Sequence, residues 1–240
     1  MNNKYQMKKV VIFGDSFANM PHAGPNWVED VANKLSLPFL NYGEAGSALN
    51  FSFVNFIRYI RSDHDPDDII IFIATDSYRV FSVDMPRAGL GVRGTLSDPD
   101  SKNEWVIENG AVACEYIEKV YHPRINYELI KALGFLNNWA DLNPCNTVIV
   151  MRVISDLLDD FPLKDFVPTS NFFPLLNGDL ATISESEHVD PANIYLPDLR
   201  TNHMSPNNLS IMAQQITDLI NTRQITSFDP SKYEKNCYIR

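Results

Sequence analysis

The segment Val10-Val11-Ile12-Phe13-Gly14-Asp15-Ser16-Phe17 predicts both the fold and a candidate site. Its first four residues are β-branched or aromatic, which predicts a short buried strand. Gly14, Asp15 and Ser16 then turn the chain at the carboxyl end of that strand. Because ligands of open α/β sheets bind at this end, we expect Ser16 to be exposed in a crevice as a candidate nucleophile. The same turn composition is also common in purely structural loops.

Length and charge limit the class of protein. A chain of 240 residues fits one domain, residues 1–240. Its formal net charge of -10 argues against nucleic acid or a membrane as a partner, because phosphate-rich surfaces attract basic proteins. The apolar run after Lys8 and Lys9 is too short for a signal peptide, and no segment reaches transmembrane length. We therefore expect synthesis in a cytoplasm; the sequence does not indicate an oligomeric state.

No pattern in the chain predicts a metal or a cofactor. The three cysteines are far apart, and we expect buried free thiols: Cys114, Cys145 and Cys237. Neither a His-x-x-x-His pattern nor a Cys/His cluster occurs. The acidic segment 63–68 lacks the glycine and terminal glutamate of a calcium loop, so we expect a solvated loop there.

Apolar patterns alternate between strand and helix along the chain. They predict strands over 10–13, 38–41, 69–74 and 147–151, and helices over 27–35, 48–61, from 123 until Asn143-Pro144, and 206–220. Ser205 as N-cap with Pro206 at the first helical position is a favourable start for the last helix. Such alternation predicts an α/β fold, a three-layer α/β/α sandwich with a parallel sheet of flavodoxin-like type.

Three segments lack this alternation. We expect an inserted irregular segment at about 80–123, with a hairpin near 105–107 and 111–113. The stretch 155–200 is rich in Asp, Phe and Pro, and we expect it to be irregular and to fold over the crevice. Residues 228–240 are expected to form a C-terminal surface tail.

Several chemically useful residues converge on one edge of the predicted sheet. Ser16, Gly46 and Asp76 each follow a predicted strand, so the turns that contain them open onto the same edge. His203 lies just before the last helix and can reach that edge as well. A serine, a histidine and nearby N–H donors form the arrangement that acyl transfer requires.

These residues lie in sequence blocks that resemble those of the SGNH hydrolases, the GDSL-type esterases and lipases. The block Val11–Phe17 matches the family's first block and places its nucleophile on Ser16. The block Asn41–Gly46 matches Asn-x-Gly-x-x-Gly, which implies that the Gly46 N–H helps to hold the oxyanion. The resemblance implies a cofactor-free serine esterase whose triad includes His203.

The third block departs from the family pattern. Ala74-Thr75-Asp76-Ser77 stands where the family usually has Gly-x-Asn-Asp, so the oxyanion-binding asparagine falls on Asp76. An ionised carboxylate cannot donate a hydrogen bond and opposes the developing negative charge. Either Asp76 is held neutral, or Thr75, Ser77 or another group supplies the third donor.

The fourth block departs as well. The family's Asp-x-x-His would put an aspartate at the position of Arg200, whereas the nearest upstream aspartate is Asp198. With a longer loop, Asp198 would complete the triad by orienting His203. Otherwise the site is a Ser/His dyad, or its carboxylate comes from elsewhere, with Asp190 next in order.

A further resemblance is to SGNH-like proteins encoded by bacteriophages, through the pattern Thr75-x-x-x-Arg79 and the run Asn202-His203-Met204-Ser205. It implies action on the O-acetyl groups of a host polysaccharide, or a place on the virion. Arg79 would bind a substrate carboxylate or pair with Asp76, and a surface salt bridge explains it equally well.

The sequence thus predicts ester hydrolysis of a small acyl group, such as acetyl, on a carbohydrate or similar soluble molecule. The alternative is a catalytically weak or inactive SGNH-fold module that binds glycan or forms a structural part of a larger phage particle. The altered third and fourth blocks favour this alternative, because losing one oxyanion donor costs about 10²- to 10³-fold in rate.

Overall fold

The computed structural model of the chain describes residues 8–18, 26–75, 79–80, 90–91, 108, 110–112, 115–116, 119–120, 122–152, 168–179, 206–224 and 232–233. Within these residues, no helix is both long enough and apolar enough to cross a membrane.

A five-stranded parallel sheet forms the centre of the fold, with strand order β2-β1-β3-β6-β7. The strands are β1 (Val10–Phe13), β2 (Phe39–Asn41), β3 (Ile69–Ala74), β6 (Thr147–Arg152) and β7 (Phe172–Asp179). The chain winds from β1 outward to β2 and then returns to place β3 on the other side of β1. This is the flavodoxin-like order, and its switch point lies between β1 and β3.

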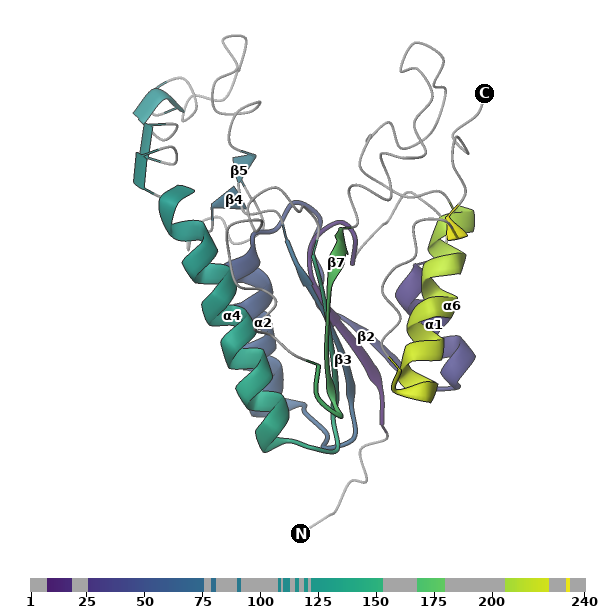
Figure 1. The fold of residues 1–240 in the computed structure, drawn as a ribbon. Coiled ribbons are helices and arrows are strands. Elements are labelled where there is room, and N and C mark those ends of the chain that lie inside the picture. The colour runs from purple at the N-terminus through teal and green to yellow at the C-terminus, as the bar shows by residue number, and fades with distance from the viewer. Residues whose placement is uncertain are drawn as a thin grey trace, which may run out of the picture.

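Helices cover both faces of the sheet (Figure 1). Helices α1 (Trp27–Leu35) and α6 (Pro206–Thr222) pack on one face, and α2 (Leu49–Ser62) and α4 (His122–Leu142) pack on the other. Strand residues alternate between the two layers: Val10 and Ile12 face α1 and α6, whereas Val11 and Phe13 face α2 and α4. The predicted three-layer α/β/α fold is therefore confirmed.

The strand β7 corrects the prediction that 155–200 is irregular. Phe172 and Phe173 are buried, and they pair in parallel with Val148 and Ile149 of β6. The sequence signal was weak because Pro174 interrupts the run. Proline lacks an N–H and is tolerated at the edge of a sheet, which is where β7 lies.

The inserted segment is described only in part. Strands β4 (Arg79–Val80) and β5 (Leu90–Gly91) form a short antiparallel pair. Residues 111–112 are helical, so the predicted hairpin is wrong at these positions, and its other arm, 105–107, lies outside the described residues.

Two smaller predictions about exposure are also wrong. Tyr233 was expected in a surface tail, yet it is buried in the α1 and α6 layer, and its hydroxyl donates to Gln215 Oε1 at 3.0 Å. Cys145 was expected to be buried, yet it is exposed after α4. The other two cysteines lie outside the part of the chain that the structure describes.

Candidate active site

Ser16 lies in a tight turn directly after β1. The Ala18 N–H donates to the Asp15 carbonyl oxygen at 3.0 Å, which closes the turn. The Asp15 side chain is fully buried, and its Oδ1 accepts the Phe17 N–H at 3.0 Å. Ser16 itself is only 3% exposed, so the prediction of a serine exposed in a crevice is wrong. The turn does place Ser16 at the carboxyl edge of the sheet, as predicted.

The loop after β2 is bonded to this turn through Gly14. The Gly14 carbonyl oxygen accepts hydrogen bonds from the Glu44 N–H at 3.0 Å and from the Ser47 hydroxyl at 3.1 Å. The Tyr42 N–H also donates to the Ile12 carbonyl oxygen at 2.9 Å. The structure therefore brings the segments of Ser16 and Gly46 together, as the sequence blocks predicted.

The structure explains why the Asn41–Gly46 block contains an asparagine and two glycines. Asn41 Nδ2 donates to the Ala18 carbonyl oxygen at 3.0 Å, and Asn41 Oδ1 accepts the Gly43 N–H at 2.7 Å. A Cβ atom added to Gly43 would lie 2.4 Å from the Ala18 Cβ, so only glycine fits. Gly46 has φ +81°, a left-handed conformation that glycine adopts without strain.

Thr75 directly follows β3, which lies beside β1 at the switch point of the sheet. It is 6% exposed, and its hydroxyl has no hydrogen-bond partner among the described residues. On the far side of β3, Ala74 pairs with Arg152 at the end of β6, and Arg152 is also buried. The sequence analysis did not single out Arg152, although a cation directly after an apolar run is unusual in a buried strand.

The remaining predicted site residues are not tested by the structure. Asp76, Asp198 and His203 lie outside the described residues, as does the alternative carboxylate Asp190. The backbone of Arg79 belongs to β4, but its side chain is not described.

Helices α1 and α6 both begin close to the Ser16 turn. Trp27 Nε1 donates to the Phe17 carbonyl oxygen at 2.8 Å, and Asn26 Nδ2 donates to the Ala18 carbonyl oxygen at 2.8 Å. Leu209, in the first turn of α6, belongs to the same core cluster as Phe17 and Trp27. The start of α6 therefore lies on the α1 side of the candidate site.

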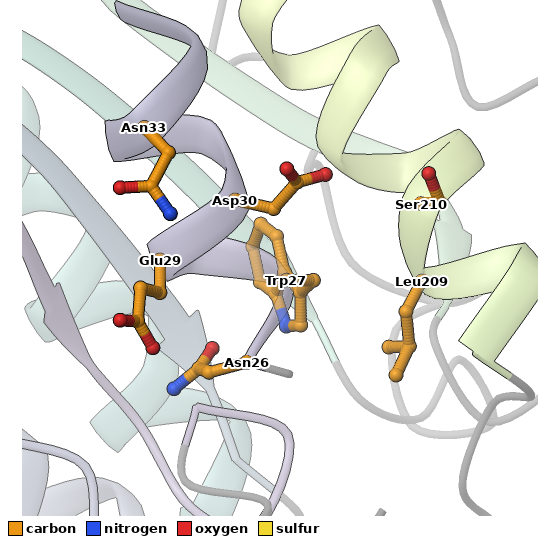
Figure 2. Close-up of a pocket in the computed structure, with 7 residues that line it drawn as sticks. All are labelled: Asn26, Trp27, Glu29, Asp30, Asn33, Leu209 and Ser210. Carbon is orange, nitrogen blue, oxygen red and sulfur yellow. The ribbon is translucent and has the colours of Figure 1, made fainter. Parts of the chain in front are cut away.

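A pocket of about 370 Å³ lies between α1 and α6, beside this turn (Figure 2). Its lining consists of Asn26, Trp27, Glu29, Asp30, Asn33, Leu209 and Ser210. Figure 2 shows Asp30 projecting from α1 toward α6. Among these lining residues two are carboxylates and none is a cation. Such a lining accepts hydrogen bonds from hydroxyl or ammonium groups and disfavours anions.

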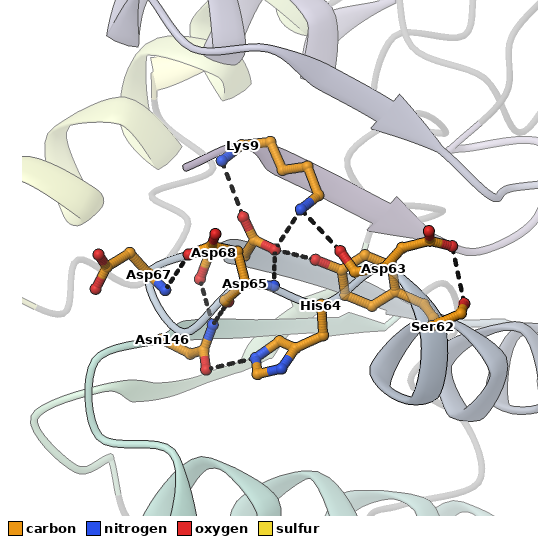
Figure 3. A network of polar contacts seen from close by, with 9 residues as sticks. Lys9, Ser62, Asp63, His64, Asp65, Asp67, Asp68 and Asn146 are labelled. Carbon is orange, nitrogen blue, oxygen red and sulfur yellow. Dashed lines mark hydrogen bonds and ion pairs between the residues drawn. The ribbon is translucent and has the colours of Figure 1, made fainter. Parts of the chain in front are cut away.

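A second polar cluster lies at the opposite end of the strands, where β1, β3 and β6 begin (Figure 3). Asp68 is fully buried, and its carboxylate accepts the Lys9 N–H at 3.0 Å and pairs with Lys9 Nζ at 2.8 Å. It also accepts the Asp65 N–H at 2.9 Å and the Tyr59 hydroxyl. The prediction that segment 63–68 is a solvated loop is therefore wrong at Asp68.

Asn146 and His64 extend this cluster to the start of β6. Asn146 Nδ2 donates to the carbonyl oxygens of Asp65 and Asp68 at 3.0 and 3.1 Å, and its Oδ1 lies 3.0 Å from His64 Nε2. The cluster joins the starting ends of β1, β3 and β6, and we interpret it as structural. In the described part of the chain, no group of three His, Cys, Asp or Glu residues is arranged to hold a metal ion.

Comparison with known proteins adds one distant similarity. No protein-family model matches the chain, and no curated protein matches it. One similar solved structure is that of a protein from Desulfitobacterium hafniense DCB-2, provisionally assigned as a lipolytic protein of the G-D-S-L family. The sequences are 15% identical, the TM-score is 0.48, and the match covers 88% of this chain and 99% of that chain. At this distance the likeness assigns neither a family nor an activity to the chain.

Proposed function

We propose that the chain is a serine esterase of SGNH type, with Ser16 as nucleophile. The observation that carries the proposal is the position of Ser16 at the switch point of the sheet, in a turn that is bonded through Gly14 to the loop of Gly46. This edge of an open α/β sheet is where ligands bind.

In the proposed reaction, Ser16 Oγ attacks the acyl carbonyl carbon while His203 accepts the hydroxyl proton. The N–H groups of Ser16 and Gly46 stabilise the tetrahedral oxyanion. His203 then protonates the departing alcohol oxygen, which leaves an acyl-serine ester. Water attacks this ester with His203 again as base, and the carboxylic acid is released. Asp198 is proposed to orient the His203 ring.

Chain connectivity supports the assignment of His203. It precedes Pro206, the first residue of α6, by three residues, which span at most about 11 Å. Leu209, in the first turn of α6, lines a pocket together with Trp27, whose indole N–H donates to the Phe17 carbonyl oxygen. A loop of this length is therefore able to present the imidazole to Ser16.

The substrate is proposed to be a small acyl ester of a carbohydrate. The 3% exposure of Ser16 favours a small acyl group such as acetyl, because a larger group must displace more of the surrounding atoms. The sugar part of the ester is proposed to occupy the pocket between α1 and α6, whose polar side chains can accept hydrogen bonds from its hydroxyl groups and include no cation. We expect Ser210→Trp, which fills this pocket, to raise KM for an acetylated neutral sugar and to leave p-nitrophenyl acetate hydrolysis unchanged.

The test is hydrolysis of p-nitrophenyl acetate and butyrate by the wild type, Ser16→Ala and the control Ser62→Ala, combined with a serine-directed phosphonate. Ser62 is an exposed serine at the end of α2. We expect turnover and a phosphonate adduct on Ser16 in the wild type and control, and neither in Ser16→Ala. Acetate should be the faster substrate. Absence of turnover and of an adduct in the wild type would refute the esterase.

A second candidate function is a non-catalytic SGNH-fold module that binds glycan or forms part of a larger particle, such as that of a phage. The burial of Ser16 favours it, because a buried hydroxyl is not available to substrate without movement of the surrounding groups. Retention of an unmodified neutral glycan by both the wild type and Ser16→Ala, without turnover of any ester, would support this candidate.

A further inference from the structure

The Thr75 hydroxyl is buried without a hydrogen-bond partner. Thr75 is 6% exposed, and no described residue donates to or accepts from its Oγ1. Such groups are uncommon in folded proteins, because a hydroxyl removed from water without a replacement bond destabilises the fold. An unsatisfied hydroxyl therefore requires an explanation, and its place in the sheet suggests one.

Thr75 and Ser16 follow adjacent strands, β3 and β1, at the same sequence distance from a paired position. Phe13 of β1 pairs with Phe72 of β3, and Ser16 and Thr75 each follow their paired residue by three positions. Because neighbouring strands lie about 4.8 Å apart, the segments that contain Ser16 and Thr75 leave the sheet next to each other, at its switch point.

The two faces of the sheet also distinguish Thr75 from its neighbours. Ile73 packs in the α1 and α6 layer, and Ala74 packs in the α2 and α4 layer. Thr75 directly follows β3, and continuing the alternation of the strand by one residue puts Thr75 on the face of Ile73. Phe17 and the first turn of α6 belong to that same layer, so Thr75 lies on the side of the sheet from which His203 is expected to approach.

We propose that the Thr75 hydroxyl donates a hydrogen bond to the oxyanion of the tetrahedral intermediate, as the third donor beside the N–H groups of Ser16 and Gly46. This inference rests on the proposed esterase function. A threonine hydroxyl donates at any pH of interest, whereas an ionised Asp76 carboxylate does not donate. The oxyanion supplies the acceptor that the folded chain lacks, so the bond forms mainly in the transition state and lowers its free energy.

The test compares Thr75→Val and Thr75→Ser with a matched control, Thr147→Val. Valine keeps the shape of threonine and removes the hydroxyl, whereas serine keeps the hydroxyl. Thr147 is fully buried, and its hydroxyl likewise has no partner among the described residues. It lies at the start of β6, at the end of the strands opposite to Ser16. Kinetics with p-nitrophenyl acetate and the thermal midpoint of unfolding are measured for each variant.

We expect Thr75→Val to lower kcat by about 10²- to 10³-fold with little change in KM, as for other oxyanion donors. Thr75→Ser should retain most of the activity, and Thr147→Val should match the wild type. Thr75→Val should be at least as stable as the wild type, because an unsatisfied hydroxyl is replaced by a methyl group. This combination of lost turnover and retained stability is not expected of a structural residue.

Three outcomes overturn the inference. The first is wild-type kcat in Thr75→Val while Ser16→Ala is inactive, in which case the esterase stands and Thr75 is not a donor. The second is a lower thermal midpoint in Thr75→Val with equal losses of kcat in Thr75→Val and Thr75→Ser, which identifies a packing role. The third is a wild type without ester turnover and without a phosphonate adduct at Ser16, in which case the proposed function fails together with the inference.

Discussion

The Ser47 hydroxyl donates a hydrogen bond to the Gly14 carbonyl oxygen at 3.1 Å, across 33 positions of sequence. This bond joins the loop after β2 to the turn that contains Ser16. The same carbonyl oxygen also accepts the Glu44 N–H, so two groups of the loop bond to one atom directly before the turn. The relative position of Ser16 and Gly46 therefore depends on hydrogen bonds that surround Gly14.

Replacement of Ser47 by alanine tests this link. Because Ser47 is buried, we expect the variant to lose about 1 kcal/mol of unfolding free energy in urea. If the chain is an esterase, kcat should fall by about tenfold or more with little change in KM, since the oxyanion donors shift relative to Ser16. The exposed Ser62→Ala variant is the control, and equal effects of the two substitutions would contradict the proposed role of the bond.

Two glycines of the second block should respond to alanine for different reasons. Gly43→Ala places a Cβ 2.4 Å from the Ala18 Cβ, and we expect a loss of roughly 2–3 kcal/mol from overpacking. Gly46→Ala meets no atom within 4 Å, but its φ of +81° should cost about 1–2 kcal/mol. Urea denaturation measures both.

A second substitution, Ala18→Gly, distinguishes overpacking from backbone strain as the cause of each loss of stability. It removes the Ala18 Cβ, the atom nearest to the Cβ that Gly43→Ala adds. Combined with Gly43→Ala, it should recover part of the lost unfolding free energy, whereas combined with Gly46→Ala it should recover none. A Gly43→Ala variant as stable as the wild type would show that the loop does not approach the turn this closely.

The buried Lys9–Asp68 pair should be important for stability and not for activity. Asp68→Asn leaves Lys9 without its counter-ion in a largely buried position, and we expect a loss of about 3 kcal/mol or more. Lys9→Met combined with Asp68→Asn should lose less than the sum of the single variants. Any ester turnover per folded molecule should be unchanged, because the pair lies at the opposite edge of the sheet; the exposed Asp67→Asn is the control.

The buried Tyr59 predicts that the free energy of unfolding falls as the pH rises into the alkaline range. Burial raises the pKa of Tyr59 far above its usual value, and the hydrogen bond to Asp68 raises it further. The folded chain thus keeps a proton that the unfolded chain releases near pH 10. The stabilisation is complete below about pH 10 and is lost above it, at up to about 1.4 kcal/mol per pH unit for this group.

We therefore expect Tyr59→Phe to show a shallower alkaline decline in unfolding free energy than the wild type. Burial also raises the pKa of Tyr42 and of Tyr233, so a part of the decline should remain in this variant. The exposed Tyr127→Phe on α4 is the control for the loss of a tyrosine. Equal slopes in Tyr59→Phe and the wild type between pH 9 and 12 would contradict the prediction.

The sequence by itself determined the central strands and the location of two site segments. Strands β1 and β3 are continuous apolar runs, and β6 contains one from Val148 to Met151. Such runs are typical of parallel strands that are covered on both faces. The sequence also predicted a turn that contains Gly46 after the second strand, and in the structure the loop after β2 bonds to the turn of Ser16 through Gly14. The roles of Asp76, Asp198 and His203 remain predictions.

Only the tertiary structure decided which polar residues are buried. Asp68 belongs to an acidic run that is typical of a surface loop, yet it is buried because Lys9, 59 positions away, supplies a charge and a backbone donor. The burial of Ser16 and Thr75 likewise depends on segments distant in sequence. Residues 172–179 form the strand β7 because their backbone pairs with that of β6. Local patterns report propensity, whereas the burial of a polar group depends on partners that only the folded chain brings together.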